Sequence, residues 1–398
     1  MIDRVVLVAC LSKDNFNRVS SLIKKEYFTK EVSTVVETIS YLHRQYEGDL
    51  SVDDVLLGHR DKYPALPEAT KKRVEREILK LKTKHNVSML GHNYMEPLVF
   101  GLSNSKEQGD SLGLSIEASK TDSDYIIFNG VPFMAETAKI MNPKKTVLVA
   151  DKSAGCSLAD NFGADEVKAL KEKHPNVPVM IYINSYADAK AECDICCTSA
   201  NAAEVAESMP GDEIIFVPDI YFAENLEREL KGKKKVIYPG KNNSVKGAIC
   251  EVHEQFTLDD ILAIRKSFDI PKGHPNRMMY VHWECKPEVL EESDYYGSTS
   301  QIRLNIANRV KEGTIERAFI ASECELTSNL AQEFPTVQFS TACSVRCSHM
   351  AKVSLFKILR ILEAIDSGKD LSEWEVTLSP ETISTAKRPI ERMLSLSS

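Results

Sequence analysis

Three segments that share one pattern decide the fold: KHNVSMLGHNY (84–94), KHPNVPVMIYIN (173–184) and GHPNRMMYVHWE (273–284). In each segment an Asn is followed by eight residues that are mostly apolar or strand-forming and that end in polar or aromatic side chains. A short run of this kind predicts a buried strand. Because the segments recur about every one hundred residues, they indicate an internal repeat.

Each segment places a pair of polar or aromatic side chains at the end of its strand. The pairs are His92 with Tyr94, Tyr182 with Asn184, and His282 with Glu284. A spacing of two residues puts both members of a pair on the same face of a strand. Ligands of open α/β sheets bind beyond the carboxyl ends of the strands, so we expect the three pairs to converge on one site.

The same succession of elements follows each segment. A helix opens with hydroxyl residues at 110–111, 198–199 and 298–299; a second strand comes at 124–128, 212–216 and 317–321; a second helix at 133–141, 222–230 and 327–334; and a third strand at 146–150, 235–239 and 336–340. The hydroxyls are expected first to cap these helices and second to bind anions. Strands that alternate with helices predict α/β units with parallel sheets.

The chain therefore divides into three α/β units and two flanking segments. With 398 residues and roughly 150 residues per domain, it is long enough for two or three cores. The predicted boundaries are an N-terminal accessory extension (1–65), the three α/β units (66–160, 161–255 and 256–350) and a C-terminal helical tail (351–398). Helices at about 66–84, 164–173 and 258–268 link the units, and the extension offers a strand (5–10) and helical periodicity (32–46).

The charge composition limits the kinds of binding partner that we expect. Lys and Arg number 50 against 58 Asp and Glu, a net charge of −8, and no long basic stripe interrupts this balance, so we expect no nucleic-acid or membrane partner. The apolar run Val5–Leu11 is only seven residues long, too short for a membrane span or a secretory signal. We therefore expect a cytoplasmic protein, whose cysteines are more often buried, catalytic or metal-binding than paired.

One cysteine follows the third strand of each unit. Cys156, Cys250 and Cys347 are separated by 94 and 97 residues, so they hold equivalent positions. Three thiolates supply one ligand fewer than the usual four of an iron-sulfur cluster, which would leave one iron open. An open iron is a Lewis acid that can bind a hydroxyl or carboxylate and assist loss of water.

The remaining cysteines carry weaker signals. Cys10, Cys285 and Cys324 are expected to be small buried side chains. The CxxC spacing at Cys193–Cys196–Cys197 and the CxxxC spacing at Cys343–Cys347 lack the second pair or the histidines of a zinc site.

At this point the motifs resemble those of the quinolinate synthase family. The matching motifs are GHNY (91–94), GDSLGLS (109–115), GVPFMAETAKIMNP (130–143), AGCSLAD (154–160), YIN (182–184), CTSANA (197–202), CEVHEQFT (250–257), VHWE (281–284) and GSTS (297–300). They occur in family order from about residue 75 to 350. The chain departs from the family at Trp283 and Pro132, where Pro and His are frequent, and in the extra N-terminal residues.

The resemblance implies three α/β/α sandwich units related by pseudo-threefold symmetry, with a [4Fe-4S] cluster held by Cys156, Cys250 and Cys347. It implies a transferase that condenses iminoaspartate with dihydroxyacetone phosphate to quinolinate, releasing phosphate and two waters, in de novo NAD biosynthesis. The enzyme that supplies iminoaspartate would be a partner.

The resemblance also assigns roles to the side chains at the strand ends. Tyr94, His282, Glu284 and His253 would be catalytic, with Tyr94 in isomerisation and proton transfer and Glu284 with His282 as an acid/base pair near the open iron. The side chains that would hold carboxylate and phosphate oxygens are His92, Ser111, Tyr182, Asn184, Ser199, Ser298 and Thr299.

Four other functions compete with this interpretation. A paralogous iron-sulfur lyase or condensing enzyme would act on a related imine. A radical iron-sulfur enzyme would need CxxxCxxC, but Met350 stands where the third cysteine would be, and a zinc enzyme lacks its ligand pattern. A redox sensor that carries an iron-sulfur cluster predicts no small-molecule site, which the paired polar residues contradict.

Overall fold

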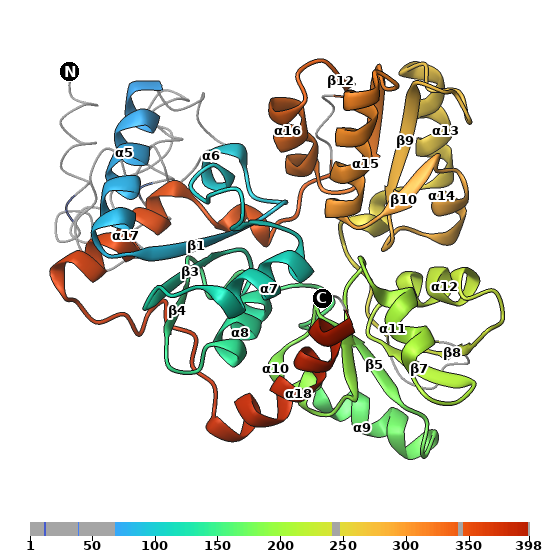
Figure 1. Cartoon of the computed structure of the whole chain (residues 1–398), viewed down its shortest axis with the longest axis horizontal. Helices are drawn as coiled ribbons and strands as arrows, with labels where there is room; N and C mark the ends of the chain where they lie inside the picture. The colour runs from blue at the N-terminus through green and yellow to red at the C-terminus, as the bar shows by residue number, and fades with distance from the viewer. Residues whose placement is uncertain (1–11, 13–38, 40–67, 241–246, 341–344, 397–398) are drawn as a thin grey trace, which may run out of the picture.

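The computed structural model describes residues 12, 39, 68–240, 247–340 and 345–396, and they form three α/β units around a common centre (Figure 1). Each unit holds one four-stranded parallel sheet, and the three sheets share one strand order, second–first–third–fourth. The α/β class with three repeated units, predicted from the sequence, is confirmed. The expected accessory extension (1–65), apart from residues 12 and 39, and the segment 241–246 lie outside the described residues.

The three units contain equivalent elements in the same order. Unit one contains α5 (Glu68–Lys84), β1 (Val87–His92), α6 (Pro97–Phe100), β2 (Gln108–Gly109), α7 (Ser111–Lys120), β3 (Tyr125–Asn129), α8 (Pro132–Met141) and β4 (Thr146–Val149). Unit two contains α9 (Ala164–Lys173), β5 (Val179–Tyr182), α10 (Ala187–Ala191), β6 (Ile195–Cys197), α11 (Ala202–Ser208), β7 (Glu213–Val217), α12 (Ile220–Glu229) and β8 (Lys235–Ile237). Unit three contains α13 (Leu258–Ser267), β9 (Arg277–His282), α14 (Pro287–Glu291), β10 (Tyr295–Gly297), α15 (Thr299–Glu312), β11 (Arg317–Ala321), α16 (Cys324–Glu333) and β12 (Gln338–Phe339).

The central strands are buried on both faces, as parallel sheets between helices require. Every residue of β1 is buried, and β5 and β9 are buried along nearly their whole length. Their apolar side chains therefore stabilise the units by removing hydrocarbon from water on either side of the sheet. Position 91 within β1 requires glycine for a steric reason, because a Cβ there would lie 2.6 Å from the Ser103 hydroxyl oxygen.

The Asn that precedes the first strand lies in the turn after the linking helix in units one and two. Asn86 and Asn176 adopt φ of 47° and 68°, in the left-handed region that Asn tolerates better than most residues. In unit three the left-handed positions are Asp269 and Gly273, several residues before the strand. The turn therefore reverses the chain and starts the strand at nearly the same point of each unit.

A short helix and a short edge strand follow each central strand, and no pattern in the sequence predicted them. They are α6 with β2, α10 with β6, and α14 with β10. The helices have four or five residues and the strands two or three, which is too short for a periodic pattern of side chains.

The caps of the next helices differ partly from the sequence prediction. Ser298 caps α15 as expected, by accepting from the Gln301 N–H at 3.2 Å. Asp110 rather than Ser111 caps α7, because its carboxylate one residue earlier accepts from the Gly113 N–H at 3.0 Å. Ser199 does not cap a helix: Asn201 accepts from the Thr198 N–H at 2.8 Å, closing a turn that delays α11 to Ala202.

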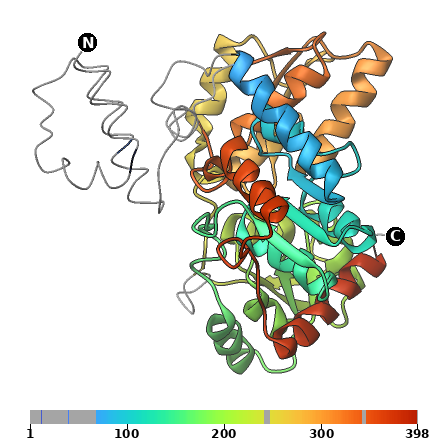
Figure 2. The same ribbon diagram turned by 90° about the vertical axis from the view of Figure 1, so that its left-hand side faces the viewer.

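The C-terminal segment joins units one and two. Helix α17 (Leu355–Ser367) packs along α5 (Figure 2) and adds its apolar face to the core of unit one. The chain then runs antiparallel to β4, where the Val149 N–H donates to the Trp374 carbonyl at 3.0 Å and covers the sheet edge. Helix α18 (Pro380–Leu396) packs on α10 and β6, and its Ile390 lies in the core of unit two.

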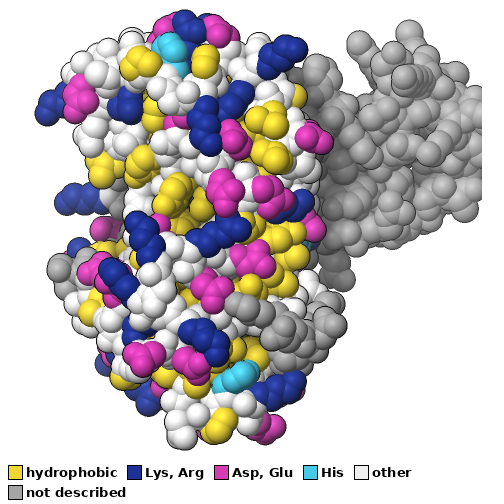
Figure 3. Space-filling model, turned by 90° about the vertical axis from the view of Figure 1, so that its right-hand side faces the viewer, with side chains coloured by type: hydrophobic (Ala, Val, Ile, Leu, Met, Phe, Trp, Pro, Cys, Tyr) yellow, Lys and Arg dark blue, Asp and Glu magenta, His cyan; other side chains and the backbone are white. Residues whose placement is uncertain are grey.

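Acidic and basic side chains are interspersed on the face of units two and three shown in Figure 3. This mixed surface agrees with the absence of a long basic stripe in the sequence. None of the helices within the described ranges combines the length and the apolar character that a bilayer crossing requires.

Replacing Ile390 by Ala tests the role of α18. Ile390 is 0% exposed, so the truncated side chain leaves a cavity, and we expect the free energy of unfolding to fall by about 2 to 5 kcal/mol in a denaturant titration. Leu304→Ala is the matched control, because Leu304 is 60% exposed and should cost less than about 0.5 kcal/mol. Equal effects of the two changes would contradict the packing of α18 on unit two.

Candidate active site

The carboxyl ends of the three sheets meet around one cavity. It encloses about 680 Å³, including its open mouth, and residues from all three units line it. The central strands β1, β5 and β9 end at His92, Tyr182 and His282, and all three side chains reach the cavity. The convergence that the repeated strand ends predicted is therefore present in the structure.

Unit one lines the cavity with His92, Tyr94, Asp110 and Ser111. The imidazole of His92 is buried, and its Nδ1 accepts from the Tyr94 N–H at 3.2 Å. Burial lowers the pKa of His92 to about 4, although Asp110 and Glu284 act in the opposite direction. His92 is therefore a neutral imidazole at physiological pH, able to donate a hydrogen bond without carrying charge.

Unit two lines the cavity with Tyr182, Asn184, Thr198 and Ser199. The Tyr182 hydroxyl donates to Glu284 Oε1 at 2.5 Å, and Asn184 Nδ2 donates to the same oxygen at 3.4 Å. Both strand-end residues of unit two thus bind a carboxylate of unit three.

Unit three lines the cavity with His282, Glu284 and Thr299. Ser298 does not line the cavity: its hydroxyl donates to Asp110 Oδ2 at 3.0 Å and is fully buried behind that residue. Thr299 accepts from Asn93 Nδ2 at 2.7 Å, so the start of α15 is held against unit one at two neighbouring points.

Glu284 is the most heavily hydrogen-bonded carboxylate of the cavity. Its second oxygen, Oε2, lies 2.8 Å from His253 Nδ1. Burial by itself would raise the pKa of Glu284, but attraction to His253, the hydrogen bond from it, and the influence of His282 and Tyr182 hold the pKa well below its usual value. The carboxylate is therefore ionised although it is only 3% exposed.

The two histidines nearest Glu284 are stacked. His253 and His282 have ring centroids 4.6 Å apart with an interplanar angle of 17°. Burial, and then the neighbouring His253, lower the pKa of His282 to about 3. Like His92, His282 is a neutral donor or acceptor at physiological pH.

Tyr94 contacts a serine, Ser322, that was not among the site residues predicted from the sequence. The Tyr94 hydroxyl lies 2.7 Å from Ser322 Oγ and 3.4 Å from His253 Nε2, and Ser322 Oγ lies 3.1 Å from His253 Nε2. Ser322 directly follows β11. A polar residue at the end of this strand was therefore the one feature of the sequence that could have indicated its place in the site. Burial, and then the Glu284 charge, raise the pKa of Tyr94 well above its usual value.

The three repeat cysteines line the same cavity, each at the start of an equivalent turn. The carbonyls of Cys156, Cys250 and Cys347 accept from the N–H four residues later, at 2.8, 3.0 and 3.0 Å. Burial raises the pKa of Cys156 to about 12, that of Cys347 to about 11 and that of Cys250 well above its usual value, although backbone N–H groups in each turn act in the opposite direction. A buried thiolate needs a nearby cation, so these turns suit a metal centre.

Hydrogen bonds tie the three cysteine turns to one another. Ser157 donates to the Ile249 carbonyl and accepts from the Glu251 N–H, both at 3.0 Å, which joins the first turn to the second. Ser348 donates to Glu251 Oε1 at 2.9 Å and joins the third turn to the second. Lys352 donates to the Ser153 carbonyl at 2.6 Å and closes the ring between the third turn and the first.

Close packing also fixes the first turn. A Cβ at Gly155 would lie 2.1 Å from Asp160 Oδ2, the oxygen that accepts from the Cys156 N–H at 2.9 Å. Only glycine leaves room for this carboxylate, which holds Cys156 in place.

Other cysteines of the described residues lie away from the cavity. Cys193, Cys196, Cys197 and Cys285 are all buried, and burial raises the pKa of each thiol. This burial agrees with the packing role expected for Cys285. Within the described residues, the CxxC cysteines of unit two do not belong to a group of three or more side chains close enough to share an ion.

Trp283 separates His282 and Glu284 in sequence but faces away from them. Its ring packs edge-on against Tyr296 at 5.0 Å and lies 5.8 Å from Phe222 of α12. Its carbonyl accepts from Asn225 Nδ2 at 2.9 Å. The residue that departs from the family motif therefore packs between units two and three without entering the cavity.

Comparison with known proteins agrees with this architecture. The family model described as quinolinate synthetase A protein matches residues 76–395. This chain belongs to that family. The match covers all three units and the C-terminal helices, and the resemblance found in the sequence motifs is confirmed.

Named relatives are similar over most of their length. Quinolinate synthase of Agrobacterium fabrum is 38% identical over 320 residues, 80% of this chain and 84% of the relative. Quinolinate synthase of Sinorhizobium fredii is 38% identical over 337 residues, 85% of this chain and 86% of the relative. Quinolinate synthase of Xylella fastidiosa is 37% identical over 320 residues, 80% of this chain and 86% of the relative.

The buried histidines predict a pH dependence of stability. The pKa values of His92 and His282 fall from 6.5 to about 4 and about 3 in the folded protein. At a pH between the folded-state value and 6.5, each of these histidines is protonated in the unfolded chain but neutral in the folded protein. The free energy of unfolding therefore rises with pH in this range and falls as the pH drops below 6.5. At pH 5 each histidine should lower the free energy of unfolding by about 2 kcal/mol relative to its value at pH 7 and above.

Denaturant unfolding of wild type and His92→Gln at pH 5 and pH 7 measures this contribution. The variant should show a smaller loss of stability on acidification, because it lacks one of the two groups. Leu304→Ala, a change at an exposed side chain that does not titrate, should leave the pH dependence as in wild type. An unchanged slope for His92→Gln would show that His92 is accessible to protons in the folded state.

Proposed function

We propose that this protein is a quinolinate synthase, which condenses iminoaspartate with dihydroxyacetone phosphate to quinolinate and releases phosphate and two waters in de novo NAD biosynthesis. One observation carries the proposal: three cysteines in equivalent turns of three units line a single cavity together with the polar strand ends. Membership of the quinolinate synthetase A family supports it.

The cysteine turns fit a [4Fe-4S] cluster held by Cys156, Cys250 and Cys347. Three thiols that line one cavity would be the ligands, and hydrogen bonds already join the turns that carry them. Three protein thiolates leave one iron for the substrate, and that iron would supply a Lewis acid for loss of water. A reducing, cytoplasmic compartment would keep the thiols available for this role.

Substrate anions would bind at helix starts. Ser111 is the first residue of α7 and Thr299 the first of α15, and both line the cavity. The N-terminal end of a helix carries partial positive charge and unpaired N–H groups, so it binds carboxylate or phosphate oxygens. Ser199, Asn184 and His92 add neutral donors around the same cavity.

An apolar wall completes the pocket. Val131, Phe133 and Met134 line it at the start of α8. These side chains exclude water from the reacting groups and so strengthen the polar contacts.

Proton transfer would use a chain of hydrogen bonds between Tyr94 and Glu284. After Tyr94 has given its proton to a substrate, a proton that Glu284 Oε2 has taken from a reacting group would pass to His253 Nδ1. The His253 Nε2 proton would then pass to Ser322 Oγ as the Ser322 proton passes to the Tyr94 phenolate. Each step spans the short distances given above, 2.7, 3.1 and 2.8 Å. Tyr94 would serve the isomerisation of the triose phosphate, and Glu284 with His282 would exchange protons during loss of water.

The enzyme that supplies iminoaspartate is the proposed partner, because an imine of this kind hydrolyses in water and is best consumed close to where it forms.

Cysteine replacement tests the proposed cofactor. Cys156→Ser, Cys250→Ser and Cys347→Ser should each lose the iron-sulfur cluster, whereas the buried control variants Cys193→Ser and Cys285→Ser should keep about four irons per chain. Iron and acid-labile sulfide analysis of anaerobically purified protein, with the visible spectrum, gives the measurement. Retention of four irons by any of the first three variants would refute the ligand set.

The reaction is tested with anaerobic protein, dihydroxyacetone phosphate and freshly generated iminoaspartate, following quinolinate by chromatography and phosphate release in parallel. Tyr94→Phe should keep its iron and lower turnover by about 10² to 10⁴-fold, as for loss of a proton-transfer group. Glu284→Gln should also keep its iron and stop turnover. Ser322→Ala should lower turnover less, because water can bridge the two rings in its place.

Tyr296→Phe is the matched control, because its hydroxyl bonds Glu229 at the surface at 2.8 Å. It should turn over as wild type does. Protein loaded with the iron-sulfur cluster that forms no quinolinate, but consumes another imine, would instead be the paralogous condensing enzyme.

A further inference from the structure

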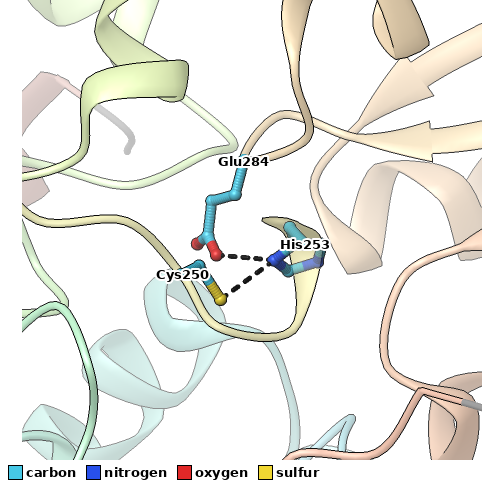
Figure 4. A group of neighbouring side chains, drawn as sticks. All are labelled: Cys250, His253 and Glu284. Atoms are coloured by element: carbon cyan, nitrogen blue, oxygen red, sulfur yellow. Dashed lines mark hydrogen bonds and ion pairs between the residues drawn. The ribbon is translucent and has the colours of Figure 1, made fainter. Parts of the chain in front are cut away.

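Cys250 belongs to a second group of ligands besides the three repeat cysteines. Its Sγ lies 3.2 Å from His253 Nδ1, which lies 2.8 Å from Glu284 Oε2, and the three atoms lie within 4.8 Å of one another (Figure 4). His253 and Glu284 are 1% and 3% exposed. Within the described ranges this is the one group of cysteine, histidine and acidic side chains close enough to share an ion.

The ligand types suit a divalent transition-metal ion. A thiolate, an imidazole and a carboxylate are all ligands of zinc and cobalt, and three protein ligands with an open fourth position form a familiar tetrahedral arrangement. One thiolate and one carboxylate balance the two positive charges of the ion. The occupied site would therefore be neutral, as a buried position requires.

The distances are close to those of an occupied site. Tetrahedral bonds to S, N and O place the sulfur about 3.6 Å from the nitrogen and the nitrogen about 3.4 Å from the oxygen. The separations of 3.2 and 2.8 Å are shorter, as expected where a hydrogen bond on Nδ1 joins the groups. Small side-chain rotations of about half an ångström would therefore admit the ion.

Surrounding side chains already orient two of the ligands. If Nδ1 binds the ion, Nε2 carries the proton and donates to Ser322 Oγ, 3.1 Å away. The free oxygen of Glu284 accepts from the Tyr182 hydroxyl at 2.5 Å and from Asn184 at 3.4 Å. Histidine and carboxylate ligands of metal ions are typically supported by such bonds, which fix the tautomer and the orientation.

We propose that the protein without its iron-sulfur cluster binds one divalent ion of the zinc or cobalt type at Cys250 Sγ, His253 Nδ1 and Glu284 Oε2. The fourth position faces the cavity. Because Cys250 can serve only one metal centre, this ion and an iron-sulfur cluster exclude each other, a consequence that rests on the proposed cofactor. The site makes assembly of the iron-sulfur cluster sensitive to zinc.

Cobalt titration of the full chain, stripped of iron by a chelator, tests the site. Co²⁺ should bind at about one ion per chain and give the near-ultraviolet charge-transfer band of a cobalt thiolate. Cys250→Ser should abolish that band. His253→Gln and Glu284→Gln should weaken binding by more than about 100-fold, and Ser322→Ala, which removes only the support of Nε2, by roughly tenfold.

Cys156→Ser and Cys347→Ser are the decisive controls, because these cysteines belong to the iron-sulfur ligand set and not to this site. Both should keep the cobalt band and wild-type affinity, and circular dichroism of each metal-free variant verifies its fold. Loss of the band in either control would show that the three cysteines hold the ion and would overturn the proposal. Retention of the band in Cys250→Ser, or absence of binding to wild type, would overturn it equally.

A second measurement addresses the exclusion. Protein preloaded with one equivalent of Zn²⁺ should take up less iron and sulfide on anaerobic reconstitution than zinc-free protein, and a chelator should restore uptake. If zinc-free protein also takes up no iron, the proposed cofactor fails while the cobalt result stands. Full uptake of iron with zinc still bound would refute the exclusion.

Discussion

A buried carboxylate, that of Glu284, joins units two and three at the cavity. It extends from the end of β9 in unit three, its Oε1 is bound by Tyr182 and Asn184 of unit two, and its Oε2 is bound by His253. An ionised carboxylate out of water is costly unless its oxygens are hydrogen-bonded. The requirement to satisfy both oxygens therefore fixes how closely the sheet ends approach one another.

The same requirement positions the groups beyond Glu284. His253, oriented by the carboxylate, presents Nε2 to Ser322, and Ser322 holds the phenol of Tyr94 from unit one. A hydrogen-bonded path thus crosses all three units, although no two of its members are neighbours in the chain. On the opposite side of the strand end, Trp283 packs between Phe222 and Tyr296 and supports the same junction by apolar contact.

The cysteine turns are also held in place by hydrogen bonds, mostly to backbone groups. Each turn is closed by a hydrogen bond to the cysteine carbonyl, and Ser157, Ser348 and Lys352 bind the turns into a ring. Such a ring limits how far the thiols can separate before any metal arrives. The C-terminal segment adds a further restraint, since α17 packs on unit one and α18 on unit two. Because Cys250 is a ligand of both, one cavity would serve either of the two metal centres proposed above.

The sequence by itself determined the features that repeat locally: the buried parallel strands, the linking helices, the polar pairs at strand ends and the equivalent cysteines. These are set by burial and backbone periodicity, which each segment carries alone. The short edge strands were not predicted, because two or three residues are too few to show a periodic pattern of side chains. The domain boundaries stay a prediction, and the first 65 residues lie largely outside the described structure. Only the tertiary structure decided that Ser322 joins Tyr94, that Ser298 turns to Asp110, and that Cys250 faces both a cysteine ring and a His–Glu pair. Contacts of this kind depend on how separate units pack against one another, and no local pattern records that geometry.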